Sequence, residues 1–478
     1  MDDVLLKSGL PKESIKQIQD VFGSLLKVDA VLLFGSRAKG SFTEGSDIDL
    51  AVKGRKFNHK DILSLNAQLE ELNLPYKIDL LNYNTINEPD LVEHIHRVGV
   101  VFYERWKSLR LEEITEPIKN TYTPDGSNHY RYIGLEHIGQ KTLRLNSVGS
   151  SSDVTSNKFL FQSGDVLFGK LRPYFRKVVQ PEFSGICSTD IWVFRAKDEI
   201  DQDYLFYFLA NWDFVNTANG GEGGTRMPRA DWNHLKATKW RIPPVVEQKI
   251  IASTLGSLDD KIHLLQRQNK TLEELAENVF DKYSKESIKS GKIGTIEDEF
   301  DFTMGQSPAG DTLNENEEGI VFFQGRSDFG FRFPEPRIYT TDATRYARKF
   351  DTLISVRAPV GDMNMAIEDC SIGRGVSAFR YKFNDKYYSY TYYKLRSLMR
   401  QIKQYNDTGT VFGSIGKDDF KRLENVIFDS DHVAKFQREV GLMDEKIYQN
   451  TVQIASLNVL RDSLLSKLIN GEIRIINY

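Results

Sequence analysis

The C-terminal three quarters of this sequence repeat themselves at a spacing of about 185 residues. Short motifs recur in the same order in both copies: Asp165 with Asp351, Phe194-Arg195 with Phe379-Arg380, Gly224-Thr225 with Gly409-Thr410, and DDKI at 259–262 with DEKI at 444–447. Four ordered matches at nearly one spacing indicate two copies of one structural unit. We therefore expect one copy at roughly 108–288, a second at 289–478, and a separate head over residues 1–106.

Each copy of the repeat ends in a long segment with helical periodicity. Apolar positions alternate steps of four and three in the first copy, and the second copy continues the pattern: Leu258, Ile262, Leu265, Asn269, Leu272, Ala276 and Val279, then Ile447, Ile454, Leu457, Leu464 and Leu468. This is the heptad pattern of a coiled-coil seam, in which one polar residue such as Asn269 often sets the register. We predict helices over 246–288 and 431–478, with regular stretches of roughly 35–38 residues or about 55 Å. The pattern leaves open that each helix is instead buried on its own globule.

A strand-rich globule precedes each predicted helix. Short β-type runs, such as VLFGKL and DIWVFR in the first copy and KFDTLISV and VIFDS in the second, are bounded by Gly, Pro and Asp. Pro243-Pro244 then breaks the chain, and Glu247 falls in the first turn of the following helix, which is a typical helix start. The body is therefore expected to be an α+β tandem repeat with globules over 107–245 and 289–430.

Residues 1–106 show no repeat and alternate helix and strand patterns, which predicts a compact α/β head. Gly35 and Ser36 stand between an apolar strand, within VDAVLLFG, and a predicted helix, where backbone N–H groups and a hydroxyl can hold phosphate oxygens. Asp47 and Asp49 are two residues apart in a strand, so their carboxylates point to one face. Asp79 adds a third carboxylate if its strand pairs beside that one. Three carboxylates around two Mg²⁺ ions suit in-line attack on an α-phosphate.

The segment GSRAKGSFTEGSDIDLAV at 35–52, together with Asp79, resembles the minimal nucleotidyltransferases of the DNA polymerase β superfamily. The resemblance covers essentially all of residues 1–106. It implies that Gly35 and Ser36 touch the triphosphate of ATP or another NTP, that Asp47 and Asp49 hold Mg²⁺, and that Asp79 is the third catalytic, metal-side carboxylate. Members of this family often pair with a small helical partner, as antitoxins or modifying enzymes. The sequence leaves open whether the head is a working enzyme or a binding module.

The ordered motifs GDVLFGKLRP, STDIWVFR and GGTRMPRADWNHLKATKWRIPPVVEQKI resemble a target-recognition domain and spacer helix of the type I restriction-modification specificity subunits. The likeness covers about 108–478, although the second copy lacks the double proline and the EQ pair at its helix start. It implies target-recognition domains at 107–245 and 289–430. Two long antiparallel coiled-coil helices, at 246–288 and 431–478, would separate them.

The same resemblance implies what the body binds. Each target-recognition domain would read one half-site of a bipartite double-stranded DNA target. The helices would set the spacing and dock two methyltransferase subunits, which use S-adenosylmethionine, and two restriction subunits would join for cleavage. The body itself would bind no cofactor and catalyse no reaction.

Local charge selects candidate DNA contacts in both globules. The chain holds 63 Lys and Arg against 67 Asp and Glu, so any DNA-binding surface has to be local. Segments 165–195 and 324–357 are net basic, and the Gly-rich loops 219–225 and 409–416 let the backbone approach DNA closely. Arginine in such loops can bind guanine edges or phosphates. The candidate DNA-binding residues are Lys170, Arg172, Tyr174, Arg176, Arg226, Arg229, Arg326, Arg357 and Lys417.

Composition narrows the remaining possibilities. No stretch approaches the roughly 18 apolar residues of a membrane span, and the N-terminus lacks a secretion signal pattern. Two distant cysteines, Cys187 and Cys370, exclude a disulfide scaffold and a cysteine zinc site. We therefore expect a cytoplasmic protein without membrane contact. Two alternatives stay open: a Mg²⁺-dependent nucleotidyltransferase, transferring AMP or acting as an antitoxin, whose body only addresses it to DNA or a partner, and a body that is a protein-interaction scaffold.

Overall fold

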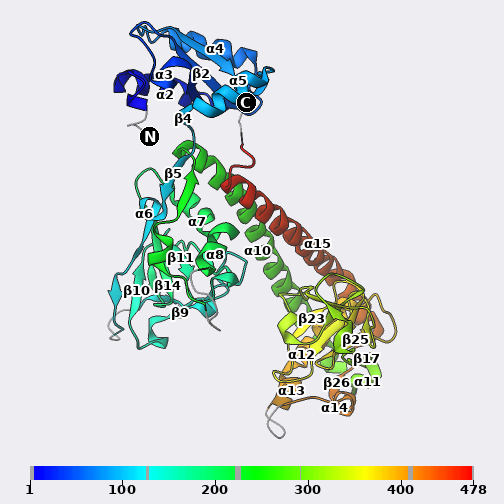
Figure 1. Cartoon of the computed structure of the whole chain (residues 1–478). Coiled ribbons are helices and arrows are strands. Elements are labelled where there is room, and N and C mark those ends of the chain that lie inside the picture. Colours follow the sequence, from blue (N-terminus) through cyan, green and yellow to red (C-terminus); the bar gives the residue numbers. More distant parts are fainter. Residues whose placement is uncertain (1–4, 125–128, 221–227, 291, 407–412, 476–478) are drawn as a thin grey trace. The chain divides into compact units, whose positions relative to one another are not determined.

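The computed structural model describes residues 5–124, 129–220, 228–290, 292–406 and 413–475 (Figure 1). The chain divides into two compact units: Met1–Ser257 with Arg461–Tyr478, and Leu258–Leu460. The first unit thus contains the head, the first globule and the end of the chain. The second contains the second globule and most of the two long helices. The chain mixes helices and strands throughout, as the sequence predicts.

The head is a four-stranded sheet with helices packed against it. Its elements are α2 (Lys12–Ser24), β1 (Val28–Phe34), α3 (Gly35–Lys39), β2 (Ile48–Gly54), α4 (His59–Glu70), β3 (Ile78–Asn82), η1 (Tyr83–Thr85), α5 (Pro89–Val98) and β4 (Val100–Glu104). The strand order is β3-β2-β1-β4, and β2 and β3 are parallel whereas the other pairs are antiparallel. Phe22, Leu33 and Leu50 belong to one buried apolar core, which holds α2 on the sheet.

In its described residues, the first globule contains three small sheets around an aromatic core. Its strands and turns are β5 (Lys107–Arg110), α6 (Leu111–Ile114), β6 (Thr115–Ile118), β7 (Thr121–Tyr122), β8 (Arg131–Ile133), η2 (Leu135–His137), β9 (Gly149–Ser150), η3 (Ser151–Asp153), β10 (Lys158–Phe161), β11 (Val166–Gly169), η4 (Pro173–Phe175), β12 (Val178–Val179), β13 (Gly185–Cys187), β14 (Ile191–Ala196) and β15 (Lys239–Ile242). Its helices are α7 (Gln202–Ala210), α8 (Trp212–Asn219) and α9 (Trp232–Leu235). The sheet orders are β7-β10-β13-β8-β9, β12-β11-β14-β6 and β15-β5. Phe168, Phe194 and Phe208 share their core with Leu465 and Leu468.

The second globule has the same number and kind of sheets. Its strands and turns are β16 (Ile293–Thr295), α11 (Ile296–Glu299), β17 (Phe300–Met304), η5 (Gly310–Thr312), β18 (Leu313–Asn314), β19 (Ile320–Phe323), η6 (Arg326–Asp328), β20 (Ile338–Thr340), β21 (Tyr346–Ala347), β22 (Thr352–Ser355), β23 (Met363–Met365), β24 (Cys370–Ile372), β25 (Val376–Tyr381) and β26 (Glu424–Val426). Its helical elements are α12 (Tyr388–Ser397), α13 (Met399–Lys403), η7 (Gln404–Asn406) and α14 (Lys417–Arg422). The sheet orders are β18-β20-β19-β24-β21, β17-β25-β22-β23 and β16-β26.

The repeat found in the sequence reappears in the contacts of the two globules. The parallel pair β8–β13 corresponds to β19–β24, and the antiparallel pair β11–β14 corresponds to β22–β25. The repeated aspartates are buried and pair with the repeated arginines, Asp165 Oδ1 with Arg195 Nε at 2.8 Å and Asp351 Oδ1 with Arg380 Nε at 2.7 Å. These matching motifs therefore stabilise the globule in each copy.

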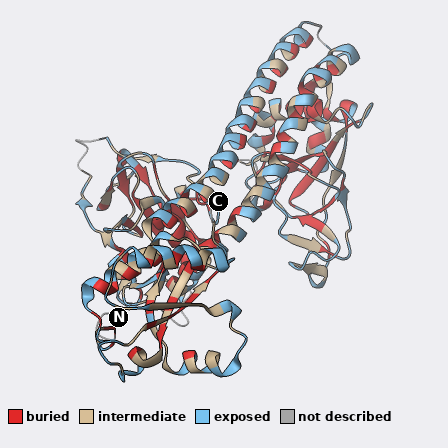
Figure 2. Cartoon of the chain, turned by 90° about the horizontal axis from the view of Figure 1, so that it is seen from above, coloured by how far each residue is buried: buried red, intermediate tan, exposed pale blue. Residues whose placement is uncertain are grey.

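Two long helices follow the globules. They are α10 (Val245–Ser290), with 46 residues, and α15 (Ser430–Ile469), with 40 residues, which corresponds to about 69 Å and 60 Å. Within the second unit they lie side by side and antiparallel: Asn450 donates to Asn269 at 2.8 Å, and Tyr283 donates to Glu439 at 2.7 Å. Buried and exposed positions alternate along both helices (Figure 2). In the described residues, no helix has the length and apolarity needed to cross a bilayer.

Several details of the helix prediction are wrong. The sequence prediction missed Asn450 on α15, which is buried against Asn269. After Ala276 the buried face continues through Phe280, while Val279 is only half-buried. The second helix does not extend to residue 478, since α15 ends at Ile469.

Gly471 explains why α15 ends there. It has φ +70°, its N–H donates to the Leu468 carbonyl at 3.2 Å, and the N–H of Glu472 donates to the Lys467 carbonyl at 2.8 Å. These are the two hydrogen bonds of a Schellman C-cap. The chain then continues as a closing segment (residues 470–475).

The closing segment contacts both the head and the start of α10. Arg474 Nη2 donates to Glu247 at 3.0 Å, and the same guanidinium pairs with Asp29 at the start of β1. In the head, Arg55 Nη1 donates to the Glu472 carbonyl at 2.6 Å. Asp29 and Arg55 lie at the ends of β1 and β2 that are remote from Gly35 and Asp49, since the two strands are antiparallel.

Candidate functional site

The turn between β1 and α3 is built around Gly35. Its φ is +72°, and a Cβ at this position would lie 2.0 Å from Asp49 Oδ2. Glycine avoids both the strained backbone and the clash. The turn therefore brings Gly35, and the chain that continues into Ser36, against the carboxylate of Asp49.

The three predicted carboxylates lie close together at one end of the head sheet. Asp49 on β2 is opposite Asp79 on the parallel strand β3, and Asp47 comes two residues before Asp49. Burial raises the pKa of Asp49, and the negative charges of Asp79 and Asp47 raise it further. The structure thus places Asp47, Asp49 and Asp79 within electrostatic reach of one another.

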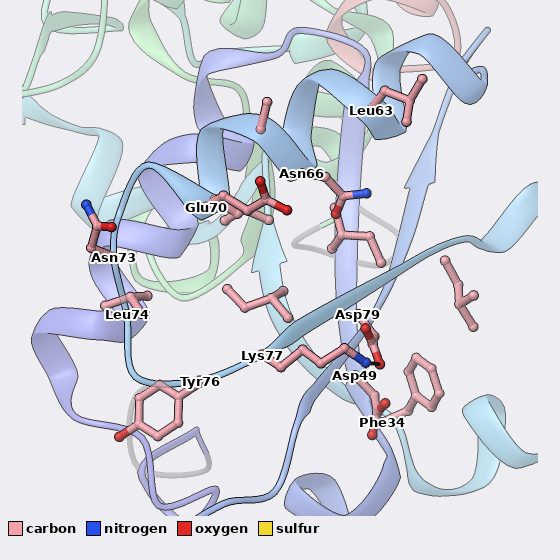
Figure 3. Close-up of a pocket in the computed structure, with 15 residues that line it drawn as sticks. Phe34, Asp49, Leu63, Asn66, Glu70, Asn73, Leu74, Tyr76, Lys77 and Asp79 are labelled. Atoms are coloured by element: carbon pink, nitrogen blue, oxygen red, sulfur yellow. Dashed lines mark hydrogen bonds and ion pairs between the residues drawn. The ribbon is translucent and has the colours of Figure 1, made fainter.

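Lys77 joins this group and was missed in the sequence. Its ammonium lies 2.9 Å from Asp79 Oδ2 (Figure 3) and 3.7 Å from Asp47 Oδ2. The hydrogen bond to Asp79 raises the pKa of Lys77, and the nearby Asp47 adds to the effect. A signal was available, because residues two apart in an extended chain point to the same face. Lys77 precedes Asp79 at that spacing.

The carboxylates have the right chemistry for Mg²⁺ without forming a ready site. In the part of the chain that the structure describes, no group of three or more His, Cys, Asp or Glu side chains is arranged to hold a metal. Asp47 and Asp79 contact Lys77 instead, yet their side chains are each 46% exposed. Carboxylate oxygens that are open to water are the ligands that Mg²⁺ prefers. The donor set therefore fits, provided that Lys77 moves away.

A cleft of about 1060 Å³ adjoins the carboxylates, large enough for a nucleoside triphosphate (Figure 3). It lies between α4 and β3. Its lining combines apolar and hydrogen-bonding side chains: Phe34, Asp49, Leu63, Asn66, Ala67, Leu69, Glu70, Asn73, Leu74, Tyr76, Lys77, Ile78, Asp79, Leu80 and Leu81. Such a lining can hold a base and ribose beside groups that handle phosphate.

In the first globule, two segments that hold predicted DNA contacts run next to each other. Leu171 forms a β-bridge with Arg229, and the Arg172 N–H donates to the Pro228 carbonyl at 2.8 Å. Arg229 is exposed and pairs with Asp190 at 3.0 Å.

The other predicted DNA contacts near the Leu171–Arg229 bridge differ in how far their side chains are exposed to solvent. Tyr174 is exposed, whereas Lys170 and Arg172 are half-buried. Burial lowers the pKa of Lys170. Arg226 lies outside the described residues.

The prediction that Arg176 contacts DNA is wrong. Its side chain is fully buried, its Nε donates to the Ala210 carbonyl at 2.6 Å, and its Nη1 donates to Asp462 at 3.1 Å. Its guanidinium also lies over the Trp212 ring. Arg176 therefore joins the first globule to the end of α15, and solvent cannot reach it.

The second globule repeats the same arrangement of segments. Arg357 forms a β-bridge with Ser414, at the positions that match Leu171 and Arg229 in the first copy. Arg357 and Lys417 are exposed. Arg326 is also exposed, and its Nε pairs with Asp362 at 2.6 Å.

Two family models match the chain. The model described as "Polymerase beta, Nucleotidyltransferase" matches residues 16–108, and the model described as "Type I restriction modification DNA specificity domain" matches residues 103–274. A protein of Methanocaldococcus jannaschii, named as the MjaX specificity subunit of a type I restriction enzyme, is 26% identical over 403 residues, covering 78% of this chain and 94% of that protein. The chain belongs to the type I restriction-modification specificity subunits.

The head and the body of this specificity subunit have separate relatives. A probable protein adenylyltransferase, MntA of Haemophilus influenzae, is 32% identical over 103 residues, covering 21% of this chain and 88% of that protein. The head is therefore a nucleotidyltransferase domain of the polymerase β type. Among solved structures, the HsdS subunit of Thermoanaerobacter tengcongensis is 25% identical, with 77% of this chain and 97% of that chain covered and a TM-score of 0.33.

The family assignment fits the division of the chain into head and body. The specificity-domain match contains the first globule and the first part of α10. Specificity subunits bind DNA and assemble with methyltransferase subunits. The nucleotidyltransferase match contains Gly35, Asp47, Asp49 and Asp79, which meet at one end of the head sheet.

Proposed function

We propose that this specificity subunit reads a bipartite double-stranded DNA target, one half-site with each globule. The observation that carries the proposal is the repeated pair of segments: Leu171 beside Arg229 in one globule and Arg357 beside Ser414 in the other. Because the same bridged pair of segments occurs in both globules, each globule can use its pair to contact one half-site. A duplex of two short sites with a fixed gap is the target that such a repeat suits.

Exposed basic residues of the two globules supply the contacts to DNA. Arg357 and Lys417 are available directly, whereas the exposed side chains of Arg229 and Arg326 each pair with a half-buried aspartate. DNA phosphates would compete with these aspartates for the two arginines, because arginine also binds phosphate through charge-assisted hydrogen bonds. Tyr174 adds an exposed aromatic ring three residues after Leu171 in the first globule.

The helices α10 and α15 serve as a coiled-coil spacer and as the docking surface for two methyltransferase subunits. The buried pair Asn269–Asn450 supports a fixed register, since a buried polar pair is satisfied in one register only. Several large apolar residues on these helices remain exposed, among them Leu264 at 50%, Leu442 at 77% and Val459 at 72%. Where such side chains lie together on the helix surface, they can form part of a docking surface for a protein partner. The methyltransferases would use S-adenosylmethionine to methylate adenine. Two restriction subunits would add the cleavage of DNA. The complex would work in the cytoplasm, where its DNA target is.

Expression with the methyltransferase subunit, followed by sequencing of cellular DNA for methyladenine, tests this proposal. The expected result is methyladenine in one split motif. A matched pair of variants sharpens the test: Arg357→Ala removes a predicted contact, and Arg348→Ala removes a positive charge elsewhere in the same globule. Methylation should fall strongly in the first variant alone. Equal methylation with both variants would refute the proposal that the segment containing Arg357 contacts DNA.

A second activity is supported by the head. The Gly35 turn, the three carboxylates and the adjoining cleft suit transfer of a nucleotidyl group from ATP or another NTP. Asp47 and Asp49 would hold Mg²⁺, which supplies charge neutralisation for the triphosphate. Asp79 would orient the acceptor hydroxyl for in-line attack on the α-phosphate. The bond to pyrophosphate breaks as the new phosphoester forms, and the hydroxyl proton leaves to a carboxylate or to water.

Incubation of the full chain with ATP labelled at the α-phosphate tests this second activity. The reaction contains Mg²⁺, the methyltransferase complex and a cell extract as a source of acceptors. Label should transfer to an acceptor with the native chain and not with Asp47→Asn plus Asp49→Asn. Equal label with both proteins would contradict the proposed chemistry.

A further inference from the structure

The Lys77 side chain lies against two of the three head carboxylates. Its ammonium contacts Asp79 at 2.9 Å and comes within 3.7 Å of Asp47, so it lies between two of the three acids. The parallel register of β2 and β3 fixes this arrangement, because it sets Asp49 opposite Asp79. Figure 3 shows the Lys77 side chain reaching from the edge of the cleft to the carboxylates.

Another basic residue near this site is fully engaged. The Arg37 side chain is buried and donates to the Ser46 carbonyl at 2.8 and 3.0 Å and to the Ser8 carbonyl at 3.0 Å. Its hydrogen bonds hold the loop before Asp47 and leave it no freedom to swing. Lys77 differs, since its side chain is 67% exposed and has four methylene groups with which to move.

We propose that the Lys77 ammonium is a tethered cation that occupies the carboxylates when no divalent metal is bound and competes with the metal for Asp47 and Asp79. The inference rests on the proposed nucleotidyltransferase function of the head. Three carboxylates this close repel one another, and a single ammonium relieves part of that repulsion. A divalent ion has twice the charge and replaces the ammonium, which then swings toward solvent at the edge of the cleft.

In the described residues Asp47 and Asp79 both contact the Lys77 ammonium, and no group of three or more His, Cys, Asp or Glu side chains is arranged to hold a metal. Two of the carboxylates are turned to the ammonium, so the site has to exchange one cation for another. Metal binding in the absence of nucleotide is therefore weaker than three carboxylates alone would give. Removal of the Lys77 charge should strengthen it.

Binding of Mn²⁺ to the full chain, without nucleotide and followed by the electron paramagnetic resonance signal of free Mn²⁺, tests the inference. Lys77→Gln should tighten binding by about three- to tenfold, because it removes an ion pair and a repulsive charge from the site. Lys77→Arg keeps the charge and should not tighten binding. Lys53→Gln is the matched control, since it removes a head lysine that lies over the Tyr83 ring. It should stay within about twofold of the native chain, because surface charges are screened over distance.

Direction of change distinguishes competition from simple damage to the fold. Damage would weaken Mn²⁺ binding, whereas loss of a competitor strengthens it. The gain in Lys77→Gln should also shrink as salt rises, because charge interactions at an exposed site are screened. Unchanged or weaker binding in Lys77→Gln, with Asp47→Asn plus Asp49→Asn abolishing it, would overturn the inference and leave the proposed function intact. Absence of Mn²⁺ binding in the native chain and in every variant would overturn both.

Discussion

Gly35 and Gly40 form a matched pair that tests how the head site is built. Both have φ +72°, a conformation that costs a side-chain-bearing residue about 1–2 kcal/mol. A Cβ at Gly35 would lie 2.0 Å from Asp49 Oδ2, whereas a Cβ at Gly40 would meet nothing within 4 Å. The two substitutions to alanine thus share the backbone cost and differ only in the contact with the carboxylate.

Gly35→Ala should therefore displace Asp49 and Gly40→Ala should not. We expect both variants to lose about 1–2 kcal/mol of head stability from the backbone. Mn²⁺ or ATP affinity should fall at least about tenfold in Gly35→Ala, equivalent to about 1.4 kcal/mol, and should stay within about twofold in Gly40→Ala. Isothermal titration with the full chains measures this, and hydrogen exchange across β1 and β2 controls for folding. Equal affinity in both variants would refute the role given to the Gly35 turn.

Three further predictions concern the rest of the chain. Arg176→Met breaks a buried pair whose partner Asp462 is 35% exposed, so we expect a loss of about 2–4 kcal/mol in the first unit. Faster hydrogen exchange across β11 and β14 should report that loss, and an unchanged methylation motif should confirm that Arg176 does not read DNA. Arg474→Ala removes the contacts to Asp29 and Glu247, so exchange should quicken in the closing segment while Mn²⁺ binding stays as it was; protection equal to that of the native chain would contradict the contact. Burial lowers the pKa of Lys394 to about 8, so the unfolded chain binds more protons between pH 8 and about 10.5 and the second unit should gain stability as pH rises through that window. Chemical unfolding at stepped pH should show this rise in the native chain and a smaller one in Lys394→Met; identical slopes would count against it.

The sequence predicted the features that depend on local pattern. The repeat, the strand-rich globules and the two long helices follow from spacing and periodicity, and the structure has all of them. The group of Asp47, Asp49 and Asp79 was also predictable, because one alternation rule and one assumed strand pairing bring the three together. The structure contains the strand pairing that this prediction assumed, because β2 and β3 are parallel neighbours with Asp49 opposite Asp79.

Other features depend on contacts between distant parts of the chain. Arg176 looked like a loop arginine for DNA, but its partner Asp462 is 286 residues away in sequence. Asn450 was missed for the same reason, since its partner Asn269 belongs to the other helix. Such partners cannot be read from periodicity, which describes one element at a time. Lys77 is different: its spacing from Asp79 was visible, but a lysine before a strand is usually an ordinary surface charge.

The most direct test of the account is the methylation pattern that this specificity subunit gives to DNA. Cells that express the chain with its methyltransferase subunit would be compared, by single-molecule sequencing, with cells that express the methyltransferase alone. We expect methyladenine in a single split motif, two short half-sites with a fixed gap, only when the chain is present. Methylation in one continuous short motif, or the same pattern with and without the chain, would contradict reading by two globules.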